Sequence, residues 1–151
     1  MATIGELCNR EVVVAGPATS ITAAAKLMRH QHVGTVVVID EVDGGLPMPV
    51  GILTDRDIVL EVCATGLDPG LITVGDIMSR ELVTAGEDQG VLEAMEVMRH
   101  RGVRRLPVVG LDGHLTGIIS VDDLLDVVAE ELGELTKVLT REQALEAAAR
   151  K

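Results

Sequence analysis

The sequence predicts an α/β (α+β) fold in which two pseudo-symmetric β-α-β-β-α repeats pack as one module and are followed by a C-terminal helix. The first observation behind this prediction is a motif at residues 51–58 that returns in weaker form at residues 117–124. The second is that residues 4–11 match residues 74–81, at an offset of 70. Two copies of this length form a symmetric pair rather than an extended array.

Each half shows the same order of elements, which runs from strand to helix to two strands to a second helix. β-branched runs indicate the strands, and apolar residues at helical spacing indicate the helices. In the first half we expect the elements at residues 12–14, 20–31, 33–39, 50–53 and 55–65, and in the second at 82–84, 89–101, 103–109, 115–119 and 121–132. The offset falls to 66 at Ser120, because the first half carries four extra residues in the turn at 43–47. Loops accept such insertions readily.

A linker and a tail complete this organisation. Residues 66–70 are rich in turn-forming residues and separate the halves. We therefore expect one repeat at residues 4–65, a second at 74–132 and a helical tail at 133–151. The tail should form a separate helix after Gly133, and its apolar residues indicate docking on the body or on a second subunit; they are Leu135, Val138, Leu139 and Leu145.

The composition excludes several classes of function. Of the 151 residues, 47% are hydrophobic and 25% are charged, which suffices for a buried core. The net charge of −11 opposes binding to a phosphate backbone, and a chain without aromatic residues lacks the stacking surfaces that single-stranded nucleic acids use. The apolar runs are too short to cross a bilayer and no secretory signal is visible, so we expect a cytoplasmic protein. Cys8 and Cys63 are isolated, and we expect them to be small buried hydrophobic residues.

The motif Gly-Ile-Leu-Thr-Asp-Arg-Asp at residues 51–57 follows the last strand of the first half. With its second copy and the matching order of elements, the chain resembles the cystathionine β-synthase (CBS) domain family, as a tandem pair called a Bateman module. Such modules bind adenosine-containing ligands, including AMP, ADP, ATP and S-adenosylmethionine, in clefts between the two repeats. The resemblance also implies a disc-shaped homodimer, for which apolar faces could come from helices bearing Ala24, Met28, Met95, Met98 and Leu125, although packing in the core would explain many of these residues equally well.

The residue pairs Thr54 with Asp57 and Ser120 with Asp123 have the spacing of a helix capping box. Capping alone would explain both pairs. A helix N-terminus with a hydroxyl group also attracts a phosphate, and a carboxylate can accept hydrogen bonds from a ribose diol. By resemblance to the family, the two carboxylates would hold ribose, and the two hydroxyls would contact ribose or phosphate.

The positive charge that phosphate requires is concentrated in the second half. Arg104 and Arg105 stand before a Leu-Pro pair, where members of the family often carry basic residues, whereas the first half has the uncharged Gly34 and Thr35 there. Arg56 is a further candidate for a phosphate contact, although a solvated surface position would explain it equally well. The two clefts are therefore expected to differ in charge.

Adenine would need an apolar slot with backbone groups at its edge. In the family, the turn after the first strand of each repeat supplies this slot, here at Val14 and Ala15 or at Thr84 and Ala85. Each of these residues taken singly could equally well do no more than end a strand. Their recurrence with the two capping motifs makes them candidates for the adenine slot.

Nothing in the sequence indicates catalysis. We identify no Ser-His-acid arrangement and no phosphate-cradling glycine loop, and the histidines lack the spacing of a metal site. We therefore expect no enzyme activity, no metal and no required cofactor. We expect a regulatory sensor that binds an adenosine ligand, forms a homodimer and modulates a partner that is a separate polypeptide. The alternative is a ligand-free scaffold for dimerisation and protein interaction.

Overall fold

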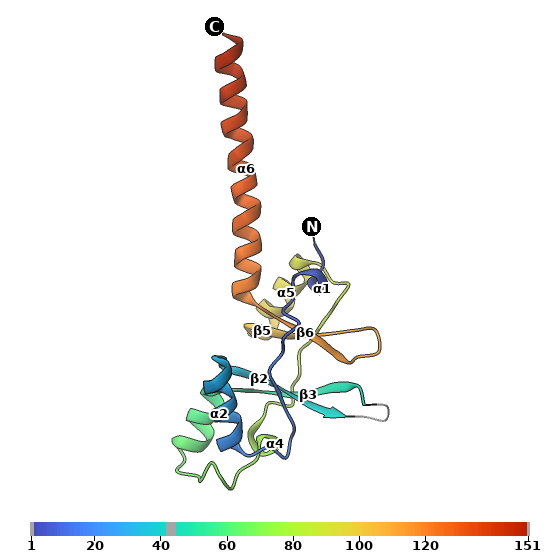
Figure 1. Cartoon of the computed structure of the whole chain (residues 1–151), viewed down its shortest axis with the longest axis vertical. Helices are drawn as coiled ribbons and strands as arrows, with labels where there is room; N and C mark the ends of the chain where they lie inside the picture. Colours follow the sequence, from blue (N-terminus) through green and yellow to red (C-terminus); the bar gives the residue numbers. More distant parts are fainter. Residues whose placement is uncertain (1, 42–44, 151) are drawn as a thin grey trace.

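Two three-stranded sheets, one from each repeat, form the body of the protein (Figure 1). The computed structural model describes residues 2–41 and 45–150, so part of the turn at 43–47 lies outside the described residues. In the first sheet, β1 (Val14–Ala15) runs parallel to β2 (Thr35–Glu41), which pairs antiparallel with β3 (Pro47–Thr54). The second sheet repeats this order with β4 (Ala85–Gly86), β5 (Arg105–Val109) and β6 (Leu115–Ser120). The predicted fold class is confirmed.

The first strand of each sheet is shorter and begins later than predicted. We expected strands at residues 12–14 and 82–84, but pairing with β2 begins only at Val14 and pairing with β5 only at Ala85. The other strands extend the predicted cores by a few residues or begin slightly later. Only Val14 is shared between the predicted and observed first strand of the first sheet, and β4 shares no residue with the predicted range 82–84, so the prediction of a strand there is wrong; pairing partners rather than local sequence set where these strands form.

One amphipathic helix packs against each sheet. The helix α2 (Ile21–Gln31) and the helix α5 (Val91–Arg101) bury equivalent residues in two separate apolar cores. Three of the residues predicted for an exposed dimer face, namely Ala24, Met28 and Met98, lie in these cores and cannot contribute to that face. Met95 and Leu125, the other two residues of that prediction, are exposed.

A second helix follows the last strand of each repeat. In the first repeat it starts as α3 (Asp55–Ile58) and continues as the π-helix η1 (Val59–Cys63). Gly66, which has a left-handed backbone, follows this helical segment. Cys8 is half-buried, but Cys63 lies exposed on η1, so the prediction of a buried cysteine is wrong at Cys63.

The first segment of each repeat crosses over to the opposite half. Each of these segments contains a short helix that was not predicted, α1 (Ile4–Leu7) in the first repeat and α4 (Val74–Ile77) in the second. Ile4 is fully buried in the core of the second repeat, whereas Val74 and Met78 lie in the core of the first. The helix α1 lies against β4 and β6 of the second sheet, and hydrogen bonds from Ile4 N to Gln89 O and from Gly5 N to Glu87 O hold it there. Each repeat thus needs a segment from outside its own sheet to complete its core.

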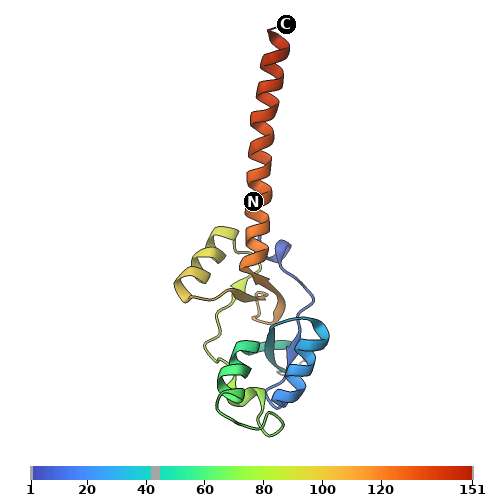
Figure 2. The same cartoon turned by 90° about the vertical axis from the view of Figure 1, so that its left-hand side faces the viewer.

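The helix α6 (Val121–Ala149) is continuous and projects from the body (Figures 1 and 2). The prediction of a separate tail helix after Gly133 is wrong, because one glycine costs only about 1 kcal/mol in a helix of otherwise strong helix formers. Docking of the tail on the body is also wrong, since every residue at 134–150 is exposed. Within the described residues, no helix is both long and apolar enough to cross a membrane.

Candidate functional site

Two clefts lie between the repeats, and the repeat symmetry relates one to the other. Cleft 1 has a volume of about 400 Å³ and is lined by the end of β3 and the start of α3, together with residues 79, 81–83 and 102–105 of the second half. Cleft 2 has a volume of about 280 Å³ and is lined by the end of β6 and the start of α6, together with residues 9, 11–13 and 32–35 of the first half. Each cleft therefore needs both repeats.

A capping box stands at the helix start beside each cleft. The Asp57 carboxylate accepts a hydrogen bond from Thr54 N at 2.9 Å, and the Thr54 hydroxyl accepts one from Asp57 N at 3.1 Å. Ser120 and Asp123 repeat these two bonds at 2.8 and 3.2 Å, and the Ser120 hydroxyl also donates to the carboxylate at 2.9 Å. The structure therefore shows that both pairs act as helix caps.

Capping leaves part of each carboxylate available. All three bonds to Asp57 and Asp123 from their capping partners use Oδ2, and an ionised carboxylate has two oxygens with about four acceptor sites. Asp123 lies in the lining of cleft 2. In the lining of cleft 1, as far as it is described, Thr54 is present and Asp57 is not. The two predicted ribose carboxylates are therefore placed differently relative to their clefts.

The three arginines identified from the sequence meet at cleft 1. Arg56 reaches it from α3, and Arg104 and Arg105 reach it from the loop and strand after α5. Asp55 and Glu81 are the acidic residues in this lining, so cleft 1 carries a formal charge of +1. Cleft 2 contains Arg105 opposed by two carboxylates, those of Glu11 and Asp123, which gives −1 with histidine neutral. The predicted difference between the clefts is thus present in their charge.

Two residues, Thr35 and Arg105, line both clefts. They occupy equivalent positions, each at the start of the middle strand of its sheet. Thr35 is only 6% exposed, and its hydroxyl oxygen has no hydrogen-bond partner among the described residues. Unpaired buried hydroxyls are rare and unfavourable in proteins. We named Thr35 only as the uncharged counterpart of Arg105; that equivalence was the signal that could have identified it as a site residue.

The residues predicted for the adenine slot lie just beyond the clefts. Ala15 and Ala85 are buried in the two cores, and Val14 and Thr84 precede them outside the lining of either cleft. The apolar walls of the clefts are formed one or two residues earlier in the chain. From these segments, Val12 and Val13 line cleft 2 and Leu82 and Val83 line cleft 1, together with apolar residues of other elements.

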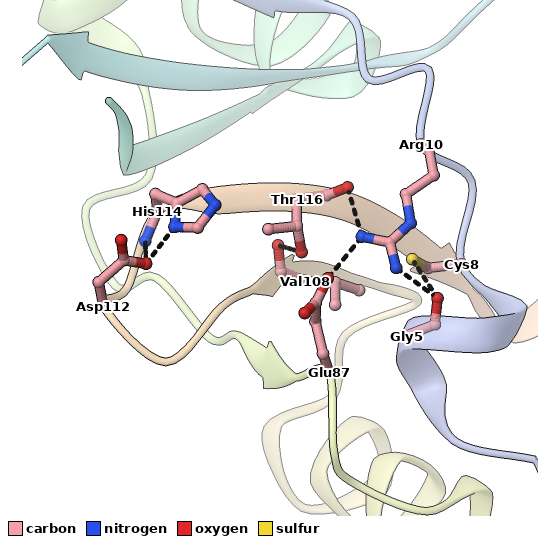
Figure 3. A network of polar contacts seen from close by, with 8 residues as sticks. All are labelled: Gly5, Cys8, Arg10, Glu87, Val108, Asp112, His114 and Thr116. Carbon is pink, nitrogen blue, oxygen red and sulfur yellow. Dashed lines mark hydrogen bonds and ion pairs between the residues drawn. The ribbon is translucent and has the colours of Figure 1, made fainter. Parts of the chain in front are cut away.

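A polar network fixes the N-terminal segment that contributes one wall of cleft 2 (Figure 3). The Arg10 guanidinium donates hydrogen bonds to Gly5 O at 2.6 Å, to Glu87 Oε1 at 2.5 Å and to Thr116 O at 3.2 Å. The bond from Arg10 lowers the pKa of Glu87 below its ordinary value of 4.5. Arg10 thereby ties the crossing segment to the loop after β4 and to β6, next to Asn9 and Glu11 of cleft 2.

Other ionisable groups in this network have local partners. Burial raises the pKa of the Cys8 thiol, which lies against Gly5 O. Asp112 pairs with His114 in the turn between β5 and β6, and this hydrogen bond lowers the pKa of Asp112 (Figure 3). Across residues 2–41 and 45–150, no three His, Cys, Asp or Glu side chains are grouped so that they could hold a metal ion.

Comparison with known proteins agrees with this architecture. The chain is 38% identical over 125 residues to an uncharacterized protein of Methanopyrus kandleri, a match that covers 83% of this chain but only 62% of that protein. It is 35% identical over 124 residues to the CBS domain-containing protein YhcV of Bacillus subtilis, covering 82% of this chain and 84% of that one. An uncharacterized conserved protein of Pyrococcus horikoshii has a solved structure that matches with a TM-score of 0.72 at 31% identity, covering 84% and 92% of the two chains.

The match to a protein family is found twice, once in each half. The model of the CBS domain family matches residues 4–63 and again residues 74–130. Together these ranges include both sheets, both capping boxes and both crossing segments. The chain therefore belongs to the CBS domain family, as a tandem pair of CBS repeats.

Proposed function

We propose that this protein is a regulatory sensor that binds an adenosine-containing ligand, namely AMP, ADP, ATP or S-adenosylmethionine, in the clefts between its repeats and modulates a separate partner protein. The observation that carries the proposal is the lining of cleft 1. Three guanidinium groups and the unpaired hydroxyl of Thr35 meet there. Arginine binds phosphate through paired hydrogen bonds, and a ligand would supply the hydrogen bond that Thr35 lacks.

Volume and charge favour cleft 1 for a phosphorylated ligand. Its 400 Å³ fall within the range of about 300–1,000 Å³ that is typical of small-molecule sites. The 280 Å³ of cleft 2 fall slightly below this range, and its two carboxylates oppose an anion. We therefore assign nucleotide phosphates to cleft 1, and a ligand without phosphate or with positive charge, such as S-adenosylmethionine, to cleft 2.

Sharing of Arg105 between the clefts has a consequence for stoichiometry. The guanidinium of Arg105 can pair closely with a phosphate in one cleft at a time, because its donors lie in one fixed fork. We therefore expect one phosphorylated ligand per chain. The ligand acts as an effector if it binds one arrangement of the two repeats more tightly than another, since only such a difference shifts a conformational equilibrium.

The first experiment is to denature the purified protein and identify any released small molecule by mass spectrometry. The chain contains no Trp, Tyr or Phe, so near-ultraviolet absorbance would report almost entirely on a bound base. Titration calorimetry with the four adenosine ligands would follow. A stoichiometric adenosine compound, or saturable heat with a stoichiometry near one, is the expected result. A protein free of ligand that gives no heat with any of the four would favour the ligand-free scaffold.

Two substitutions separate ligand binding from structure. Replacing Thr35 by valine removes the unpaired hydroxyl, so we expect unchanged or higher stability but lower ligand affinity. Arg105→Ala should reduce nucleotide affinity by roughly ten- to a hundredfold, the usual effect of losing a hydrogen bond between charged groups. Arg101→Ala is the matched control, because Arg101 is exposed on α5 and outside both clefts. Equal affinities in all three variants would contradict the assignment of cleft 1.

The capping carboxylates need their own test, because capping is already observed. If they also hold ribose, Asp57→Asn and Asp123→Asn should lower affinity sharply while stability changes little. If they serve only as caps, stability should fall modestly and affinity should stay the same. If both variants bind nucleotide and S-adenosylmethionine as tightly as wild type does, the two carboxylates do not hold ribose. The phosphate contacts of the arginines would then still be tested by the Arg105→Ala variant.

A further inference from the structure

The exposed face of α6 carries a row of aliphatic residues that the clefts do not explain. Seven of them have between 37% and 62% of their surface exposed, and we call them the α6 stripe; they are Leu125, Val128, Leu132, Leu135, Val138, Leu139 and Leu145. Contiguous apolar patches of this kind on a protein surface mark sites of interaction. The helix projects from the body, so its own module does not cover the stripe (Figure 2).

The spacing within the stripe is that of a coiled coil. Positions 125, 128, 132, 135 and 139 alternate steps of three and four residues. This heptad spacing keeps one seam facing a second helix, and the small drift of a 3.6-residue helix makes the two helices wrap around each other. A helix with such a seam is complementary to another copy of itself.

The outer half of α6 packs against no other part of the described chain. Every residue at 134–150 is exposed. Helices in proteins owe most of their stability to packing of an amphipathic face, and isolated helical segments are marginal in water. Two local ion pairs, Lys137 with Glu134 and Arg150 with Glu146, are exposed and contribute little. Pairing with a second helix would supply the missing packing.

Charge selects the orientation of the two helices. Residues 121–134 contain six acidic and no basic residues, whereas residues 135–150 contain three basic and two acidic ones. Parallel pairing would place the two acidic halves together. It would also bring Glu142 and Glu146, which continue the three–four spacing after Leu139, against their own copies in the seam. Antiparallel pairing places each acidic half against the slightly basic half and avoids these like-charge contacts.

An apolar groove at the base of α6 continues the stripe. Residues of α5, the loop after α5 and the first residue of α6 line this groove, which has a volume of about 520 Å³. Its apolar lining residues are Leu92, Met95, Met98, Val103 and Val121. In an antiparallel pair, the three–four spacing places Val128 opposite Leu139 of the second copy and Leu132 opposite its Leu135, and it brings Glu146 of the second copy beside Val121 at the edge of this groove. Arg99, also in the groove, would then be near the acidic Glu146 of the second copy.

We propose that α6 is a self-association element, which pairs antiparallel with α6 of a second copy of this chain and holds two modules at opposite ends of a helical pair. This proposal is independent of ligand binding. It also differs from the disc-shaped dimer that the family resemblance implies, in which the module bodies would form the interface.

Light scattering after size exclusion tests the pairing. Wild-type protein should have twice the 16.0 kDa chain mass at micromolar concentration. Leu135→Asp, at the centre of the stripe, should be monomeric and lose helical circular dichroism from α6. The control Thr140→Asp adds the same charge to the same helix away from the stripe, and should remain dimeric. Thermal unfolding should show that the module stays folded in both variants.

Cysteine cross-linking tests the orientation. In a background with Cys8→Ala and Cys63→Ala, chains carrying Val128→Cys should cross-link to chains carrying Leu139→Cys. Self-cross-linking of Val128→Cys chains would show a parallel pair and overturn the antiparallel arrangement. A wild-type monomer, or a dimer that Leu135→Asp leaves intact, would overturn the role of α6 itself, since the stripe would then face solvent or a different partner.

Discussion

Replacing Gly117 by alanine tests the contact that holds the N-terminal segment across the second sheet. Gly117 lies on β6, where the crossing strand makes two hydrogen bonds, between Asn9 and Ile118, each of 2.9 Å. A Cβ atom at Gly117 would lie 2.5 Å from Cys8 Sγ and 3.0 Å from Asn9 O. Both distances are too short, so either the crossing segment or the strand must move.

The size of the effect follows from these two contacts. Inserting a methyl group into a closely packed site usually costs about 1–3 kcal/mol, and a protein of this size loses about 2–4 °C in Tm per kcal/mol. We therefore expect Gly117→Ala to lower Tm by roughly 2–12 °C. Adding Cys8→Ala removes the thiol but leaves the Asn9 carbonyl in place, so the double variant should recover part of the loss and not all of it.

Far-ultraviolet circular dichroism is the appropriate assay, because the chain has no aromatic fluorophore. Gly133→Ala is the matched control: an added Cβ there meets nothing within 4 Å, and Gly133 lies within α6, so this variant should be stabilised by up to about 1 kcal/mol. A Gly117→Ala protein as stable as wild type would refute the close-contact argument. So would a loss of stability that Cys8→Ala does not change.

Two further predictions concern the crossing segment. Ile4→Ala should lower the free energy of unfolding in urea by about 2–5 kcal/mol, because Ile4 is fully buried in the core of the second repeat. The control Leu111→Ala, at a fully exposed position, should have almost no effect. If the two variants lost the same stability, the exchange of segments between the repeats would be contradicted. Glu87→Gln should lower Tm more at pH 7 than at pH 3. The lowered pKa of Glu87 means that its contribution is present above the ordinary value of 4.5 and is lost as the pH falls through the folded-state pKa. A Tm difference that is the same at both pH values would show that the pairing with Arg10 is not responsible.

Several features of the fold were predictable because they are written in local patterns. The repeat of residues 51–58 at 117–124 predicted the pseudo-symmetry, and the Thr-x-x-Asp and Ser-x-x-Asp spacings predicted the two caps beside the clefts. The same signal was present and overlooked at Thr3 and Thr73. Each of these donates its backbone N–H to an acidic residue three positions later, at 2.9 Å, at the start of α1 and α4.

The composition of the site was only partly predictable. The sequence identified Arg56, Arg104 and Arg105, and the structure brings all three to cleft 1. It could not show that Arg105 faces both clefts, or that Thr35 is buried there without a partner. These facts depend on how the two sheets meet, and no local pattern encodes contacts between residues that are 70 positions apart in the sequence.

By itself, then, the sequence determined the repeat, the order of elements and the chemical groups available for a ligand. Each of these follows from neighbouring residues through helical or strand periodicity and capping. The tertiary structure alone decided that α1 and α4 exchange halves, which residues share a cleft, and that α6 continues through Gly133 into solvent. These outcomes depend on burial, which is a property of the whole packed chain: a core accepts whichever apolar segment completes it, whatever that segment's distance along the sequence.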